Sequence, residues 1–563
     1  MSLSPSAHVD TFCRDNLPPP AQWPELVFDL PELHYPDRLN AATRLLDDTV
    51  ARFGADRPCL LSPTEHWTYG ELLTRANQIA AVLVAQGVVP GNRVLLRGPN
   101  NPWLVACWFG VLKAGAVAVT TMPMLRAHEL AKIVESCGPT LALVDDRFTD
   151  ELATLGLPML TYRTNLVSVE CGYSHTQHSR GELGVLARAM PGTFDDIETA
   201  ADDVALLAFT SGTTGRPKAT MHFHRDLLAI ADTFSRHVLR PEKDDVFAGS
   251  PPLAFTFGLG GLLVFPMHAG AATLLLEKAS PIELIERATE HGVTVLFTAP
   301  TAYRAILASG HATKLRGLRR AVSAGESLPE PVAREFHQVT GRWLIDGIGG
   351  TEMLHVFIAA ADDDVRPGAT GKVVPGYRAA VLDVDGRPVP DGVPGLLAVR
   401  GPTGCRYLHD ARQGSYVRDG WNLTGDTFIR DGDGYFIYQA RSDDMIVSSG
   451  YNIAGPEVEE VLLRHPDVVD CAVVAAPDEA RGSIVAAYVV LRAGAAADSA
   501  TATELQTFVK GVAAPYKYPR RVEFLDALPR NASGKLQRYL LRERAGSQVA
   551  QSVLGGGARK ALA

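Results

Sequence analysis

The segment from Thr210 to Lys218 is the most informative part of the sequence for chemistry. Four hydroxyl side chains and two glycines precede a lysine: Thr210, Ser211, Gly212, Thr213, Thr214, Gly215 and Lys218. Glycine lets main-chain N–H groups approach an anion, the hydroxyls add donors, and lysine adds a compact positive charge. The segment predicts a phosphate-binding loop, although it lacks the G-x-x-x-x-G-K-[ST] pattern. A flexible polar turn is the alternative for such a cluster taken alone.

The residues around this loop favour the phosphate-binding interpretation. The apolar run Val204 to Phe209 precedes it and predicts a buried strand. Helical spacing begins near Arg225. A glycine-rich loop between a strand and a helix is a common way to point main-chain donors at a phosphate group.

The elements that must position this loop alternate along the chain. Helical spacing at 40–53 and 71–86 is interleaved with short apolar runs at 93–96 and 116–120, and the alternation resumes over 273–308. This pattern predicts parallel α/β layering. The Pro-rich residues 1–40 predict an extended lead-in on the surface. The apolar run 103–112 is too short to span a bilayer, so it predicts a buried helix.

The pattern of residue types along the chain changes twice toward the C-terminus. Residues 371–400 carry Gly, Pro and short alternating runs, which predict a small β-rich unit. After 441, a Pro-initiated helix near 456 and apolar runs at 468–475 and 484–491 predict a small α+β domain. The fold class expected is therefore α/β: a large N-terminal domain of layered α/β subdomains plus a β-rich unit, followed by a small mobile α+β C-terminal domain.

The net charge and the cysteine pattern disfavour several classes of protein. The chain has 563 residues, a net charge of −9, and seven cysteines without a CxxC pair. The negative charge disfavours nucleic acid as a partner, and no apolar segment predicts a membrane partner. The cysteine pattern predicts reduced thiols and no zinc site. With no secretory pattern in the opening residues, we expect a cytoplasmic protein.

Five further segments, taken with the loop, resemble the motifs of the adenylate-forming superfamily in the family's order. This superfamily includes acyl-CoA synthetases, peptide-synthetase adenylation domains and firefly luciferase. The segments are Ser323-Ala-Gly-Glu-Ser-Leu328, Asp346-Gly-Ile-Gly-Gly-Thr-Glu352, Trp421-Asn-Leu-Thr-Gly-Asp426, Arg441-Ser-Asp-Asp444 running into Ser449-Gly-Tyr-Asn452, and Pro529-Arg-Asn-Ala-Ser-Gly-Lys535. The resemblance extends over essentially the whole chain, because these motifs follow one another from the loop to Lys535.

The resemblance implies a ligase that uses ATP, Mg²⁺ and coenzyme A, with Lys535, Thr351 and Glu352 as catalytic residues. Glu352 matches the family's Mg²⁺ ligand, and Thr351 matches a donor to the α-phosphate. Lys535 would bridge the carboxylate and the α-phosphate. The implied ATP or AMP contacts are Thr210, Ser211, Gly212, Thr213, Thr214, Gly215, Lys218, Gly325, Glu326, Asp346, Gly347, Ile348, Thr351, Asp426 and Arg441. Without the motifs, these residues would read as turns, surface pairs or solvated side chains.

The resemblance also implies domain boundaries and a rotation of the small domain between two half-reactions. The expected division is a domain at 1–440, a hinge at 441–446 centred on Asp443, a domain at 447–545, and a tail at 546–563. After rotation, Ser449, Gly450 and Tyr451 would line the coenzyme A tunnel.

Two departures from the family pattern bear on the acid substrate. Ile348 stands where many members stack an aromatic residue on adenine, and Phe255 stands where many ligases carry His. The aromatic and glycine-rich surroundings of Phe255 suit a flat apolar acid, with core packing as the alternative. The residues expected around the acid are His222, His224, Phe255, Thr256, Gly258, Ala324, Gly349 and Gly350. The Asp-Gly-Ile-Gly form at 346–349 resembles the benzoate–CoA ligase branch, and the lead-in at 10–18 and the hinge continuation at 445–457 most resemble 2-aminobenzoate–CoA ligases.

The sequence therefore predicts an aryl-CoA ligase acting on 2-aminobenzoate or benzoate. One alternative is an adenylation enzyme that loads an aryl acid onto a carrier-protein thiol, and another is a synthetase for a non-aromatic acid. A non-catalytic nucleotide-binding relative is a third. The expected partners are the aromatic carboxylate, ATP and coenzyme A, and a homodimer is left open as an oligomeric state.

Overall fold

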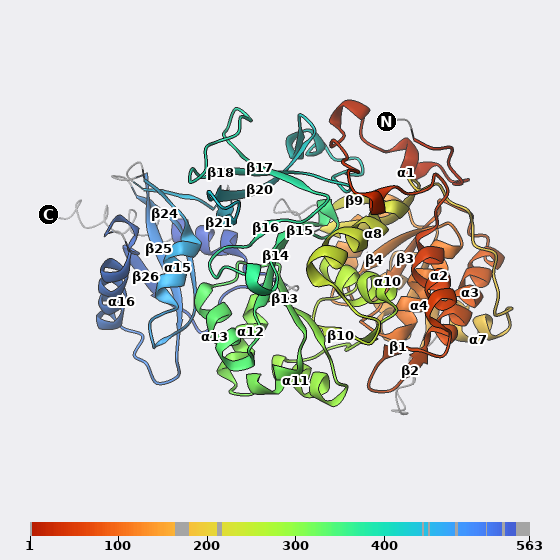
Figure 1. Ribbon diagram of the computed structural model, residues 1–563, viewed down its shortest axis with the longest axis horizontal. Helices are drawn as coiled ribbons and strands as arrows, with labels where there is room; N and C mark the ends of the chain where they lie inside the picture. Colours follow the sequence, from red (N-terminus) through yellow and green to blue (C-terminus); the bar gives the residue numbers. More distant parts are fainter. Residues whose placement is uncertain are drawn as a thin grey trace.

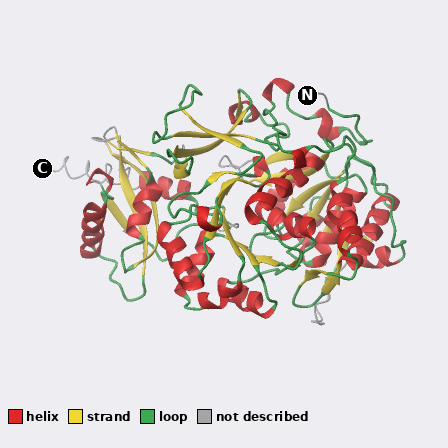
Figure 2. Cartoon of the chain, in the orientation of Figure 1, coloured by secondary structure: helices red, strands yellow, loops and turns green. Residues whose placement is uncertain are grey.

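The fold was examined in a computed structural model (Figure 1). The structure describes residues 3–163, 179–210, 217–441, 444–448, 451–478, 482–513, 515–531 and 535–547. As the sequence predicts, the protein has a mixed α/β architecture with a large N-terminal domain and a smaller C-terminal domain. Figure 2 shows helices packed around the strands of both large sheets.

A seven-stranded sheet carries the loop between Thr210 and Lys218. Its order is β7-β6-β5-β3-β4-β8-β9, parallel except for the last pair. The strands are β3 (Arg93–Arg97), β4 (Val117–Thr121), β5 (Leu141–Asp145), β6 (Met159–Tyr162), β7 (Ser179–Glu182), β8 (Val204–Thr210) and β9 (Lys218–Phe223). The helices along this stretch are α3 (Tyr69–Ala85), α4 (Pro102–Lys113), α5 (Ala127–Cys137), α6 (Asp150–Ala153) and α7 (Leu183–Arg188).

A nine-stranded sheet lies beside it, in the order β16-β15-β14-β13-β12-β10-β11-β1-β2. Its strands are β1 (Pro58–Leu61), β2 (His66–Thr68), β10 (Val246–Gly249), β11 (Ala272–Leu274), β12 (Val295–Thr298), β13 (Arg320–Ala324), β14 (Leu344–Gly349), β15 (Val356–Ala359) and β16 (Lys372–Val373). The other helices before residue 341 are α1 (Phe12–Asp15), α2 (Asp48–Phe53), α8 (His224–Ile230), α9 (Thr256–Leu259), α10 (Phe265–Ala269), α11 (Pro281–Glu290), α12 (Pro300–Ala308) and α13 (Glu330–Thr340).

The predicted β-rich unit is a five-stranded sheet, and the C-terminal domain follows it. The first contains β17 (Arg378–Leu382), β18 (Gly395–Arg400), β19 (Val417–Arg418), β20 (Trp421–Arg430), β21 (Phe436–Arg441) and the short helix α14 (Gln413–Tyr416). The second contains β22 (Ile446–Ser448), β23 (Tyr451–Ile453), α15 (Gly455–Leu462), β24 (Val468–Asp478), β25 (Gly482–Leu491), α16 (Ser499–Val512) and β26 (Arg521–Phe524). This domain lies at the left end of the molecule in Figure 1.

Helix α4 is the buried helix that its apolar sequence predicts. Every residue from Leu104 to Lys113 is buried. A Cβ atom on Gly110 would lie 2.6 Å from Ile79, so glycine lets α3 pack closely on α4. Within the described ranges, no helix has the length and apolar character that a bilayer crossing requires.

Candidate functional site

The loop of the sequence analysis joins two strands of one hairpin. β8 and β9 pair antiparallel, with Thr210 opposite Lys218. Strand β9 was not predicted, because the helix α8 was expected to follow the loop directly. Ser211, Gly212, Thr213, Thr214 and Gly215 lie outside the described residues.

Lys218, Tyr407 and Glu352 meet beside the end of this hairpin. The Lys218 ammonium donates to the Tyr407 hydroxyl at 3.1 Å and lies 3.9 Å from Glu352 Oε1. The Tyr407 hydroxyl donates to the same Glu352 oxygen at 2.5 Å. Burial, and then the charge of Glu352, raises the pKa of Tyr407 far above its ordinary value, so the hydroxyl keeps its proton. Sequence reasoning missed Tyr407, which belongs to none of the motifs.

The turn that carries Glu352 is held by a hydrogen bond from His222. Thr351–Met353 form one 3-10 turn, after which the buried Leu354 adopts a φ of 68°, a strained value for a residue with a side chain. The Nε2 atom of His222 lies 2.8 Å from the Thr351 oxygen. A carbonyl oxygen only accepts, so this ring carries its proton on Nε2.

His222 in turn lies against a buried ion pair. Its Nδ1 is 3.7 Å from the carboxylate of Asp226, which pairs with Arg406. All three side chains are fully buried. Since the described polar contacts of His222 are with Thr351 and Asp226, its role in acid binding stays a prediction.

His224 has its own main-chain partner. Its Nδ1 accepts from the Ala41 N–H at 3.1 Å. Burial lowers the pKa of His224 to about 3, so the ring is neutral near pH 7. The observed contact ties the start of α8 to the N-terminal segment, and acid binding by His224 stays a prediction.

Asp426 and Arg441, the two residues expected at the ribose, form an ion pair, and their contact with a ribose stays a prediction. They lie opposite each other on β20 and β21, with the guanidinium 3.1 Å from the carboxylate. Burial raises the pKa of Asp426, while the positive charges of Arg441 and Lys535 act to lower it.

The Tyr416 phenol is influenced by the charges of both Glu352 and Asp426. Burial, and then the charges of Glu352 and Asp426, raise the pKa of its phenol. Lys218, Tyr407 and Glu352 thus meet from three separate segments of the chain, and Asp426 pairs with Arg441 on two neighbouring strands.

The adenine-side segments occupy neighbouring parallel strands. Ser323 pairs with Asp346 and Ala324 with Gly347, at the carboxyl ends of β13 and β14. Burial raises the pKa of Asp346 to about 8, against hydrogen bonds from Thr370 and the Gly347 N–H. Gly325 follows with a φ of 91°, which favours glycine.

The strand β14 continues toward the Thr351–Glu352 turn. Ile348 is half-buried against the main core. A Cβ atom on Gly349 would lie 2.7 Å from the His355 oxygen, whereas Gly350 has more room, its nearest neighbour being Glu352 Oε2 at 3.5 Å.

Lys535 stands on one arm of a hairpin whose other arm carries Arg530 and Asn531. The Asn531 N–H donates to the Lys535 oxygen at 2.8 Å, and the Lys535 N–H donates to Asn531 Oδ1 at 2.9 Å. Arg530 bridges to Leu536 across the same hairpin. The bend at 532–534 lies outside the described residues.

Three predicted hinge and tunnel residues, Asp443, Ser449 and Gly450, lie outside the described residues. Tyr451 begins β23. Their expected roles stay predictions.

The aromatic residues near Phe255 enclose a histidine that sequence reasoning did not single out. The His355 ring lies 5.8 Å from Phe257, 5.3 Å from Phe234 and 4.6 Å from Phe265, measured between centroids. It is 2% exposed, and among the described residues neither ring nitrogen makes a hydrogen bond of good geometry, although the Phe257 main chain lies near enough to act on its pKa. Burial lowers the pKa of His355 to about 3, so the ring is neutral. The signal in the sequence was a polar residue inside the apolar run 353–361.

The glycines of this region fill close contacts. A Cβ atom on Gly258 would lie 2.1 Å from the Pro252 oxygen, and one on Gly260 would lie 2.3 Å from His355. Only glycine therefore fits at these two positions. Contacts of Phe255, Thr256 and Gly258 with an acid stay predictions.

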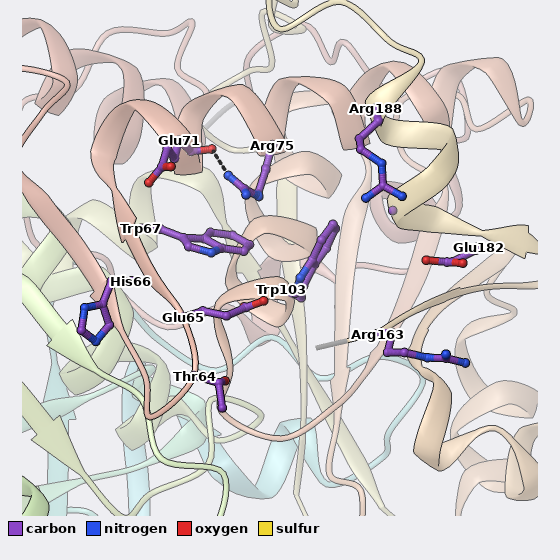
Figure 3. A pocket seen from close by; sticks show the side chains of 11 residues that line it. Thr64, Glu65, His66, Trp67, Glu71, Arg75, Trp103, Arg163, Glu182 and Arg188 are labelled. Carbon is purple, nitrogen blue, oxygen red and sulfur yellow. Dashed lines mark hydrogen bonds between the residues drawn. The ribbon is translucent and has the colours of Figure 1, made fainter. Parts of the chain in front are cut away.

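A separate cavity of about 440 Å³ shares none of the predicted residues (Figure 3). It lies between β2, α3, α4 and α7. There the ring centroids of Trp67 and Trp103 are 5.7 Å apart, and the Arg75 guanidinium stacks over the Trp67 ring. The site chemistry described above is elsewhere in the fold.

Glu352 suits the magnesium ion that the resemblance implies. Across the described ranges, no three His, Cys, Asp or Glu side chains gather as ligands for a metal. Mg²⁺ bound to a nucleotide takes most of its ligands from phosphate oxygens and water, so one carboxylate is chemically sufficient.

Comparison with known proteins agrees with this geometry. Residues 46–407 match the model of the AMP-binding enzyme family, and residues 457–535 match the AMP-binding enzyme C-terminal domain. A benzoate–CoA ligase of Thauera aromatica is 34% identical over 91% of this chain and 97% of its own.

Solved structures give the same result. An anthranilate–CoA ligase in complex with anthranoyl-AMP aligns with a TM-score of 0.85 at 31% identity, over 92% of this chain and 100% of that one. A benzoate–CoA ligase from Burkholderia xenovorans LB400 aligns with a TM-score of 0.81 at 30% identity, over 90% and 100%. The chain belongs to the AMP-binding enzyme family.

Proposed function

We propose that the protein is a cytosolic, ATP-dependent aryl-CoA ligase whose substrate is 2-aminobenzoate or benzoate. In the first half-reaction, a carboxylate oxygen attacks the α-phosphorus of ATP and pyrophosphate leaves. In the second, the coenzyme A sulfur attacks the acyl carbon and AMP leaves. The observation that carries the proposal is the contact of Lys218 and Tyr407 with Glu352 beside the end of the phosphate hairpin.

The first half-reaction brings two anions together, so the site must offset their repulsion. Lys218 extends from the end of the phosphate hairpin, and Lys535 enters from the small domain. Mg²⁺ held by Glu352 would neutralise phosphate charge. Asp426 can accept both ribose hydroxyls, and Arg441 holds that carboxylate in place.

The aromatic cluster supports a flat acid as substrate. Phe255 and Phe257 are half-buried, and Phe257 lies 5.5 Å from Phe297. A ring buries apolar area with no internal torsions to order, whereas a fatty chain must order many. The resemblance to benzoate–CoA and anthranilate–CoA ligases favours the same class of acid.

The choice between benzoate and 2-aminobenzoate depends on a polar partner for the ortho substituent. His355 joins His222, His224 and Thr256 as a candidate. Its neutral ring offers one donor and one acceptor, neither of them in a hydrogen bond of good geometry among the described residues. A site built for a hydrogen bond can discriminate by orders of magnitude against an acid that lacks it.

ATP–pyrophosphate exchange over a panel of aryl, aliphatic and amino acids tests the proposal. We expect benzoate or an ortho-substituted benzoate to have the highest specificity constant, with medium and long fatty acids poor. A fatty acid of about eight or more carbons that matches every benzoate would contradict the aryl assignment. Faster transfer to a phosphopantetheinyl carrier than to free coenzyme A would contradict the CoA-ligase assignment.

A further inference from the structure

A chain of four alternating charges joins the small domain to the large one. Arg304 on α12 lies 2.8 Å from Asp470 on β24, Asp470 lies 3.1 Å from Arg530, and Arg530 lies 2.7 Å from Glu326. The two ends, Arg304 and Glu326, belong to the large domain. The two central residues belong to the small domain, whose strands lie beside α12 and α13 in Figure 1.

These side chains are partly shielded from water. Their exposed fractions are 24% for Arg304, 19% for Asp470, 25% for Arg530 and 17% for Glu326. Charges shielded to this extent interact more strongly than fully exposed pairs, and each one here has an opposite charge beside it. The cost of partial burial is therefore offset within the chain.

The ion chain reaches both catalytic halves of the site. Arg530 stands on the hairpin arm opposite Lys535, which is held by two hydrogen bonds between Asn531 and Lys535. Glu326 stands two residues after β13, which pairs with β14, the strand that carries Asp346 and leads to the turn with Glu352. A shift of Arg530 relative to Glu326 would therefore move Lys535 relative to the nucleotide site.

We infer that Arg304, Asp470, Arg530 and Glu326 form a latch that holds Lys535 in place for adenylation. The inference rests on the proposed two-step function. Arg304–Asp470 and Arg530–Glu326 cross between the domains and must break if the small domain turns for thioester formation. Arg530–Asp470 lies within the small domain and can persist. Arg304, Asp470 and Arg530 are positioning residues, because they act through the Lys535 hairpin, whereas Glu326 is also among the residues expected at the nucleotide.

The test separates the two half-reactions in the full chain. Arg304→Gln and Asp470→Asn remove cross-domain charge without touching residues assigned to the nucleotide or acid. Arg334→Gln is the matched control, since within the described residues Arg334 pairs only with Glu330 on its own helix and is 60% exposed. Adenylation is followed by pyrophosphate exchange, and the second step by coenzyme A transfer from supplied aryl-adenylate.

We expect Arg304→Gln and Asp470→Asn to slow adenylation about three- to tenfold, with transfer unchanged or faster. Arg304→Lys, which keeps the charge, should stay within about twofold of the parent. About 0.5 M salt should slow adenylation by the parent and narrow the gap between parent and variants.

Two results would overturn the latch: unchanged adenylation in both variants, or equal slowing of both half-reactions. Melting temperatures and the Arg304→Lys variant distinguish a lost latch from a folding defect. If the parent adenylates no acid in the panel, the proposed function fails. If the parent is active and the variants match it, only the latch fails.

Discussion

The Nε2 atom of His222 donates to the main-chain oxygen of Thr351 across 2.8 Å, directly before Glu352. Two segments far apart in the sequence are thereby joined: β9, which follows the phosphate loop, and the turn that presents Glu352. The backbone next to this turn includes the strained Leu354. A fixed anchor on Thr351 helps to hold a conformation that the local sequence does not favour.

Replacement of His222 by Leu should slow adenylation about tenfold, because a buried hydrogen bond of this kind is worth roughly 1–3 kcal/mol. His222→Gln keeps a donor and should retain most of the activity. Pyrophosphate exchange measures both. His237→Leu is the control, since His237 pairs with Glu32 near the surface. Equal rates for the Leu and Gln variants would contradict the anchor.

Tyr407→Phe should raise the Mg²⁺ concentration needed for half-maximal adenylation by about tenfold. The Tyr407 hydroxyl orients the Glu352 carboxylate, and loss of such outer contacts commonly costs 10- to 100-fold in metal affinity. A Mg²⁺ titration at saturating ATP checks it, and Mg²⁺-dependent ATP binding by calorimetry gives a readout without turnover. Tyr435→Phe, whose hydroxyl contacts Asp364, serves as control. An unchanged titration midpoint would remove this role.

Lys535→Ala should abolish most adenylation while leaving transfer from supplied aryl-adenylate nearly intact. The reason is that Lys535 is expected to contact only the first transition state, after which the small domain turns away. Single-turnover assays of each half-reaction make the comparison. Equal loss in both steps would count against the assignment.

The stability of the fold should fall as pH drops below about 6.5, and His355 should contribute to the loss. Its pKa is about 3 in the folded protein and near 6.5 in an unfolded chain, so acid protonates the unfolded chain first. The contribution is fully present above pH 6.5 and declines by about 1.4 kcal/mol per pH unit until the folded pKa is reached. Between pH 7 and pH 5, the free energy of unfolding of the His355→Leu variant should therefore fall by about 2 kcal/mol less than that of the parent. Urea unfolding of both proteins at both pH values measures this difference. An equal fall in the free energy of unfolding for parent and variant would refute the prediction.

The sequence predicted the layered fold and the motif segments because each depends on residues close together in the chain. Helical spacing in α3 and the apolar runs of β3 and β4 are local patterns, and the structure confirms them. Tyr407 was missed because its partners, Lys218 and Glu352, become its neighbours only through folding. The close contacts of Gly258 with Pro252 and of Gly260 with His355 could not be predicted, because they too arise only through folding.

Strand β1 also has a consequence for protein synthesis. Leu60 pairs in parallel with Thr273, and the whole seven-stranded sheet is encoded between them. On a ribosome that adds about 5–20 residues per second, β1 would emerge roughly 10 to 40 s before β11. During that interval one edge of β1 has no native strand to pair with, and exposed strand edges promote association between chains. A nascent chain released before residue 272 should therefore aggregate or be held by chaperones, whereas release after the nine-stranded sheet is complete should allow folding.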